Sequence, residues 1–143
     1  MLAGELALVT ASLFTGAAIY VSVAEQPARL GLDDCALLAE WKPAYKRGFA
    51  MQAPLALLGF ILGAIAAYVS GWRFLLGALV LLANWPFTLI VIMPVNSRLM
   101  AMEAESAGPD SRALIEQWGR LHAARGALGA AATALFLWAA QAS

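Results

Sequence analysis

The sequence has little charge, one cysteine and one histidine. Only 13% of its 143 residues are charged and 62% are hydrophobic, whereas soluble domains have about 25% and about 45–50%. This composition excludes an ordinary soluble domain. The net charge is zero, so the chain lacks the basic surplus of a nucleic-acid-binding protein. Single Cys and His residues exclude an internal disulfide framework, a multi-cysteine zinc site and a bis-histidine haem.

The charged residues leave four long gaps between them. Uncharged runs of 19, 25, 24 and 18 residues follow Glu5, Arg47, Arg73 and Arg125. A helix that crosses the hydrocarbon core needs about 20 mostly apolar residues. The gaps therefore predict an all-α, integral membrane four-helix bundle that forms a single transmembrane domain, and a buried soluble bundle is the weaker alternative. The domain is 1–143, with spans at about 2–24, 49–70, 72–93 and 122–140.

Sixteen of the 18 charges lie in two stretches that four spans would place on one side of the membrane. These stretches, 25–47 and 98–125, hold eight of the nine Lys and Arg residues, and the expected cytoplasmic segments between the spans are about 25–48 and 94–121. Because Lys and Arg favour the cytoplasmic side, we expect both stretches in the cytoplasm and both termini outside it. Glu5 stands where a signal peptide would be basic, so we expect a retained first span. The predicted location is the bacterial cytoplasmic (inner) membrane.

Capping signals predict where helices begin within the charged stretches. Asp33 and Asp34 favour the start of a short helix that runs through Trp41 and ends before Pro43. Pro43 would then lie in the first turn of the second long helix. Pro109 and the two residues after it predict the start of the fourth long helix.

Polar side chains, which are costly at membrane depth, gather toward one end of the predicted bundle. Alternate helices run in opposite directions, so Glu25, Gln52, Asn96, His122 and Arg125 should all approach the inner boundary. Asn84 should lie deeper, because it follows Trp72 by about 18 Å of helix. We therefore expect a pocket that opens at the cytoplasmic end.

Each of these polar residues also has a structural interpretation. Arg125 can extend to the interface and hold the orientation, and Glu25 can form an ion pair with Arg29. Asn84 can join helices by a hydrogen bond, and His122 can be a hydrogen-bonded structural residue. Under these interpretations the chain is a non-catalytic membrane protein, either a lipid- or quinone-binding protein or an accessory subunit.

Five segments carry the motifs of a known family. They begin at Tyr20, Trp41, Ala83, Ile92 and Trp118, and the most specific are Asn-Trp-Pro at 84–86 and Trp-x-x-x-His-x-x-Arg at 118–125. These motifs resemble the anthrone-oxygenase-like family of small membrane proteins. The resemblance implies an enzyme that uses O₂, without a cofactor or metal, to oxidise a lipophilic anthrone- or quinone-like molecule.

Such a reaction assigns a role to each polar or aromatic candidate. His122 would be the base, with Glu25 as its orienting partner or the second candidate base. Oxyanion donors would be Arg125, Asn84 and Asn96, and the substrate-binding residues would be Trp118, Trp85, Tyr45, Gln52 and Arg29. The expected partners are a lipophilic small molecule or lipid, the membrane, and a second copy or a membrane complex, with no nucleic acid.

Overall fold

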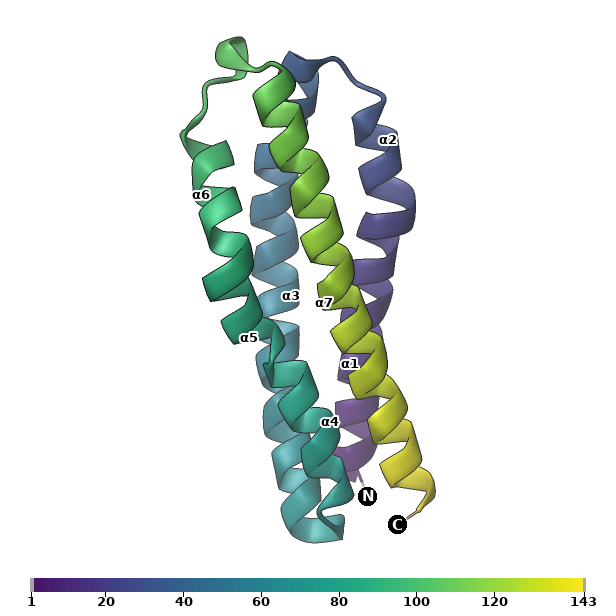
Figure 1. The fold of residues 1–143 in the computed structure, drawn as a ribbon. Coiled ribbons are helices and arrows are strands. Elements are labelled where there is room, and N and C mark those ends of the chain that lie inside the picture. Colours follow the sequence, from purple (N-terminus) through teal and green to yellow (C-terminus); the bar gives the residue numbers. More distant parts are fainter. Residues whose placement is uncertain (1, 143) are drawn as a thin grey trace.

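The computed structural model describes residues 2–142, which form four long helical rods (Figure 1). The first rod joins α1 (Leu2–Tyr20), η1 (Val21–Glu25) and α2 (Gln26–Leu30), and the second is α3 (Asp34–Ser70). The third joins α4 (Arg73–Leu82), α5 (Asn84–Phe87), η2 (Thr88–Ile92) and α6 (Met93–Ala101). After the short helix η3 (Ala104–Ser106), the fourth rod is α7 (Pro109–Gln141).

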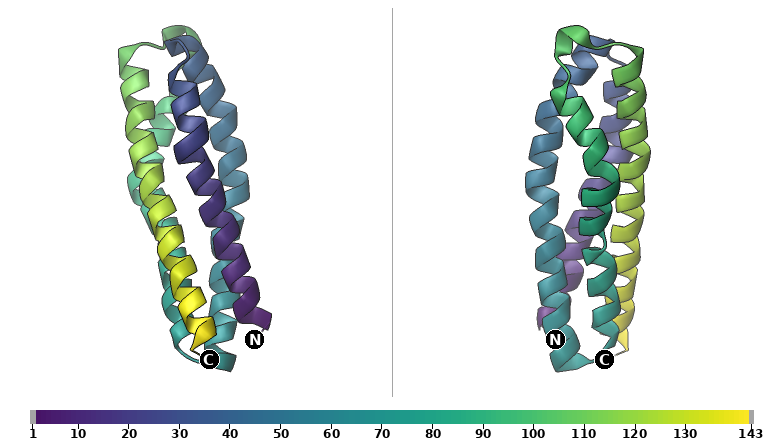
Figure 2. Two further views of the ribbon diagram at one scale, coloured as in Figure 1. Left: turned by 90° about the vertical axis from the view of Figure 1, so that its right-hand side faces the viewer. Right: turned by 60° about the vertical axis from the view of Figure 1, so that its left-hand side comes forward.

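All four rods are long and apolar enough to cross a membrane, and no strand occurs within residues 2–142. The prediction of an all-α membrane bundle with four spans is therefore confirmed. The start of α1, the α3–α4 turn and the end of α7 lie together at one end (Figures 1 and 2). We call the half of the bundle next to this end the terminal half. The other half, which ends in the connections at 31–33 and 102–108, is the loop half.

The second rod differs from the expectation at Pro43. A separate short helix ending after Trp41 is wrong, because α3 runs without a break from Asp34 to Ser70. Pro43 removes one backbone hydrogen bond, but its side chain is exposed and is not part of the buried core. The expected cap is confirmed, since the Asp33 carboxylate accepts a hydrogen bond of 2.9 Å from the N–H of Ala36.

Small residues bring the helices of the terminal half into close contact. Its core holds Phe14, Phe74 and Phe136 among alanines. Gly63 and Gly77 both press against the Phe136 ring, since a Cβ on either glycine would lie 2.8 Å from a ring carbon. This tight packing supplies the van der Waals contacts that hold helices together in lipid.

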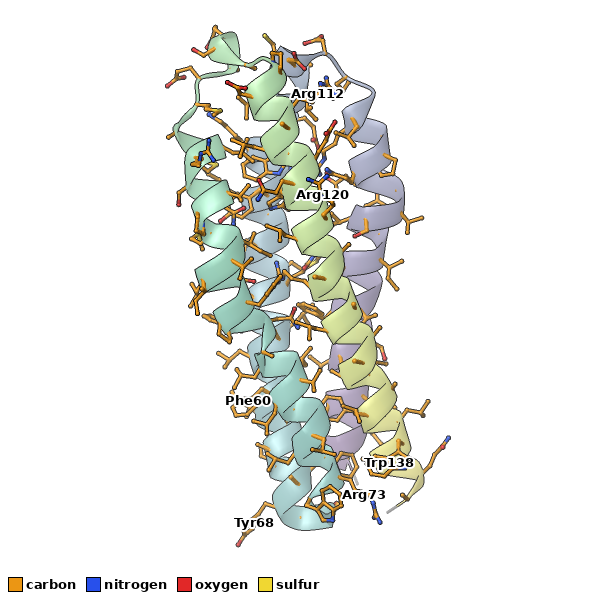
Figure 3. The ribbon with its side chains drawn as sticks, viewed as in Figure 1. Phe60, Tyr68, Arg73, Arg112, Arg120 and Trp138 are labelled. Carbon is orange, nitrogen blue, oxygen red and sulfur yellow. The ribbon has the colours of Figure 1, made fainter. Side chains whose placement is uncertain are left out.

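The two ends of the bundle are fastened differently. At the terminal end, the Arg73 guanidinium lies 5.6 Å from the ring centre of Trp138 (Figure 3). At the loop end, the Arg112 side chain reaches Asp34 at 2.5 Å and donates to the Leu30 carbonyl at 2.9 Å. Arg112 therefore ties the start of α7 to the connection between the first two rods.

Candidate functional site

A cavity of about 560 Å³ lies in the loop half, with walls from all four rods. Its lining residues from η2, α6 and α7 are buried, whereas Tyr20 of α1 and Met51 of α3 are 62% and 52% exposed. The cavity therefore opens sideways between α1 and α3, toward the surface that lipid would cover. Its volume is within the range of pockets for small organic molecules, about 300–1,000 Å³.

Two stretches of π-helix widen the rods beside this cavity. In both η1 and η2, the residue after the stretch donates its N–H to a carbonyl five residues back. A proline follows one position later, at Pro27 and Pro94, and cannot donate to the carbonyl four residues before it. The wider turn accommodates this loss. Both stretches contribute residues to the cavity wall.

Several buried polar groups in the cavity wall lack protein partners. His122 and Arg125 are 3% and 7% exposed, and Gln52 and Thr88 are equally buried. Within residues 2–142, no hydrogen-bond partner is found for His122 Nδ1, Arg125 Nε, Gln52 Oε1 or Thr88 Oγ1. Buried polar atoms are almost always hydrogen-bonded. A cluster of unpaired atoms around one cavity therefore favours a ligand site over a packing network.

Arg29 is also buried beside the cavity, but its charge is compensated. Its Nη2 lies 2.5 Å from Glu25 Oε1, and its Nε lies 3.1 Å from Glu40 Oε2. The ion pair of Glu25 with Arg29 is thus confirmed. None of the ion pairs within residues 2–142 joins Glu25 to His122, and the Arg29 guanidinium, one helical turn along the same rod, engages this carboxylate.

Aromatic rings form one wall of the cavity and support His122. Tyr45 stacks on Trp41 with ring centres 4.9 Å apart, and Trp41 meets Trp118 edge-on at 5.8 Å. Trp118 in turn lies 4.9 Å from the His122 ring. The Arg29 guanidinium lies 5.5 Å from the Trp118 ring centre. These contacts restrict the position of His122 relative to the cavity.

The structure brings eight of the ten predicted site residues to this cavity. These eight are Glu25, Arg29, Tyr45, Gln52, Asn96, Trp118, His122 and Arg125. Asn84 and Trp85 instead line a second cavity of only about 10 Å³, which shares Arg125 with the first. These two residues are therefore not part of the lining of the main cavity, and their role in ligand contact stays a prediction. Their side chains bond to backbone carbonyls, Asn84 to Leu81 at 3.1 Å and Trp85 to Ala53 at 3.3 Å.

Comparison with known proteins adds a family to this geometry. The sequence model described as anthrone oxygenase matches residues 41–135. The chain belongs to the anthrone oxygenase family. No curated protein and no solved structure matches the chain.

The match to the anthrone oxygenase family covers about two thirds of the chain. It includes the cavity residues of η2, α6 and α7 and those of α3 other than Glu40, among them Trp118, His122 and Arg125. Glu25 and Arg29 precede the matched region. The family match therefore includes the aromatic wall and the unpaired polar groups. It does not include Arg29, so the ion pairs of Arg29 are known only from the structure of this chain.

One wall of the cavity was not predicted from the sequence. Glu40, Ala44, Gly48 and Met51 line it from one face of α3, at intervals of three and four residues. This periodicity is visible only if the helix is continued through Pro43, which the sequence analysis treated as a boundary. In the described part of the chain, no group of three or more His, Cys, Asp or Glu side chains could hold a metal ion.

Proposed function

We propose that this chain is a membrane-embedded, cofactor-independent oxygenase. Its substrate is a lipophilic aromatic molecule of the anthrone or reduced quinone type, bound in the main cavity. The observation that carries the proposal is the cavity itself, because His122, Arg125 and Gln52 line an apolar, aromatic-walled space and each also has a buried polar atom without a hydrogen-bond partner within residues 2–142. Family membership supports the same reaction class.

The chemistry needs a base, an oxyanion site and dioxygen. The base removes a proton from the doubly benzylic CH₂ group, and the carbanion passes one electron to O₂. The resulting radical pair combines to a peroxide. Loss of the second benzylic proton with cleavage of the O–O bond then gives the ketone and one water. With an anthrone, one oxygen atom enters the product and the other leaves as water, so O₂ is the only oxidant required. A reduced quinone would instead pass two electrons and two protons to O₂, which gives the quinone and hydrogen peroxide.

Different residues of the cavity wall supply the base, the oxyanion site and the contacts with the aromatic rings of the substrate. His122 is the base, since its Nδ1 has no partner among the described residues and an imidazole can accept a carbon-bound proton. Arg125 and Asn96 stabilise the oxyanion. Trp118 and Tyr45 contact the faces of the aromatic substrate. Glu25 is assigned no proton transfer with His122, because Arg29 engages it.

The lateral opening supports entry of the substrate from the membrane. A planar, apolar molecule partitions into the bilayer and reaches the cavity between α1 and α3 without crossing water. We place the cavity toward the cytoplasmic side of a bacterial inner membrane, because the loop half holds eight of the nine Lys and Arg residues. Cys35 is exposed at the loop end. It should react with an impermeant thiol reagent in inside-out vesicles, and labelling of intact cells would contradict this placement.

The direct test is oxygen uptake by the purified protein in lipid nanodiscs. We expect wild type to consume oxygen with an anthrone or a reduced quinone faster than empty nanodiscs, and His122→Ala to fall to background. Gln117→Ala, an exposed change one helical turn away on α7, should retain wild-type uptake. Equal uptake by His122→Ala would remove His122 as the base. Substrate binding without uptake by wild type would indicate a binding protein instead of an oxygenase.

A further inference from the structure

Arg125 is a buried cation with no counterion in the described part of the chain. It comes from the middle of α7, is 93% buried, and none of the ion pairs within residues 2–142 includes it. Its Nε has no hydrogen-bond partner. One face of the guanidinium lies 5.5 Å from the Phe14 ring centre. The interpretation that Arg125 extends to the interface is therefore wrong, since the side chain turns inward.

The other charges around the cavity do not neutralise Arg125. The two acidic groups in the wall are Glu25 of η1 and Glu40 of α3, and both are engaged by Arg29 of α2. Arg47 of α3 is exposed at the rim and adds a further positive charge. The wall residues from η2 and α6 carry no charge.

The remaining titratable neighbours are not anions near neutral pH. They are Tyr45 of α3 and His122 of α7, which lie in the same cavity wall. The described wall carries one more positive than negative charge only when the exposed Arg47 is counted. Without Arg47 the formal charges balance, but both carboxylates pair with Arg29 and neither forms an ion pair with Arg125. A cation at membrane depth is costly unless it is paired, and its pairing with Phe14 offsets only about 2 kcal/mol at best. A negatively charged ligand would give Arg125 the ion-pair partner that it lacks among the described residues.

We infer that the cavity takes a lipophilic weak acid, a phenol or enol, as its anion, with the ionised oxygen against Arg125. The inference rests on the proposed function only in treating the cavity as a ligand site. It specifies the substrate class, because a neutral aromatic hydrocarbon or an ether would leave Arg125 unpaired. The proton lost from the ligand hydroxyl passes to the solvent, and the aromatic rings remain in contact with Trp118 and Tyr45.

A coloured phenol provides the probe. The absorption of 2-hydroxyanthraquinone moves to longer wavelength when its hydroxyl ionises, and its methyl ether cannot ionise. At a pH where the dye in empty nanodiscs is neutral, we expect nanodiscs that contain the protein to show the spectrum of the anion. The ether should bind at least about tenfold more weakly, as expected for the loss of one charge-assisted hydrogen bond.

Substitutions on α7 assign the effect to Arg125. Arg125→Gln should lose both the anion spectrum and the preference for the phenol, and Arg125→Lys should retain a part of both. The matched control is Arg120→Gln, which removes the same charge at an exposed position of the same helix (Figure 3). It should behave as wild type. The comparison of phenol with ether in wild type needs no variant, so misfolding of Arg125→Gln would not remove the test.

Three results would overturn the inference. They are equal affinity for phenol and ether, a neutral spectrum for the bound dye, and loss of the anion spectrum in Arg120→Gln to the same extent as in Arg125→Gln. Oxygen uptake does not enter these measurements. A chain that binds the anion without consuming oxygen would contradict the proposed oxygenase and leave this inference intact. A chain that oxidises its substrate but binds the neutral ether as tightly as the phenol would support the proposed oxygenase and contradict this inference.

Discussion

The two halves of the bundle use the same four rods for opposite purposes. In the terminal half, glycines and alanines bring the helices together around Phe14 and Phe136, and buried hydroxyls are bonded. Thr15, for example, contacts Thr133 at 3.1 Å and donates to the Ala11 carbonyl at 2.8 Å. In the loop half, π-helical turns separate the rods around a cavity with unpaired polar atoms. The binding site thus lies in the loop half, beside a second buried core that includes Leu37, Trp41 and Leu99, whereas the terminal half is packed throughout.

The largest effect should come from filling the cavity. Ala44→Trp places an indole at the cavity wall and should lower oxygen uptake about a hundredfold or more, because the substrate can no longer reach its reactive position. Ala50→Trp adds the same indole to the exposed side of α3, outside the cavity. The measurement is oxygen uptake by both variants in nanodiscs, which compares an indole inside the cavity with one outside it. A fully active Ala44→Trp would show that the reaction takes place elsewhere.

A smaller effect should follow from a methyl group added in each half. Gly77→Ala would bring a Cβ to 2.8 Å from Phe136 and should lower the free energy of unfolding by about 1–3 kcal/mol. Gly48→Ala meets no atom within 4 Å, and its gain in helix propensity is about 1 kcal/mol at most. Thermal unfolding in detergent measures both. If Gly48→Ala proved the more destabilising, the loop half would be the tightly packed one.

The smallest effect concerns one hydroxyl in each half. Thr133→Val removes the contact with Thr15 and should cost about 0.6 kcal/mol, a typical value for hydrogen bonds between membrane helices. Thr88→Val removes a buried hydroxyl that has no partner within residues 2–142, so it should cost nothing or stabilise slightly. Unfolding experiments in the same detergent compare the two. A larger loss in Thr88→Val would indicate that its hydroxyl supports the fold.

The sequence predicted the four spans and a part of the cavity wall. Gaps between charges are sufficient to identify spans, because bilayer thickness sets the length of a helix. Helical spacing also grouped Trp118, His122 and Arg125 on one face of α7, and the structure places all three at the cavity. The packing partner of Gly129 could not be predicted from the sequence, because only the fold shows that Gly129 faces Phe14.

The failures of prediction occur where the backbone departs from a regular helix. Pro43 is the usual sign of a boundary, yet its exposed position lets α3 continue and brings Glu40 to the cavity. The π-helical turns depend on which carbonyl each N–H selects, and residue periodicity does not specify this. Glu25 was within reach of both His122 and Arg29, and the choice between them depends on three-dimensional distances.

The central claim is that the polar groups of the loop half serve a ligand at the expense of stability. Gln52→Met tests it most directly, because Gln52 is 99% buried in the cavity wall and its Oε1 has no partner among the described residues. An unpaired buried amide costs about 1–3 kcal/mol, so we expect the variant to unfold at the same or a higher temperature. Its oxygen uptake should fall about tenfold, since the hydrogen bond to substrate is lost. A variant that unfolds at a clearly lower temperature and keeps its full uptake would contradict the claim.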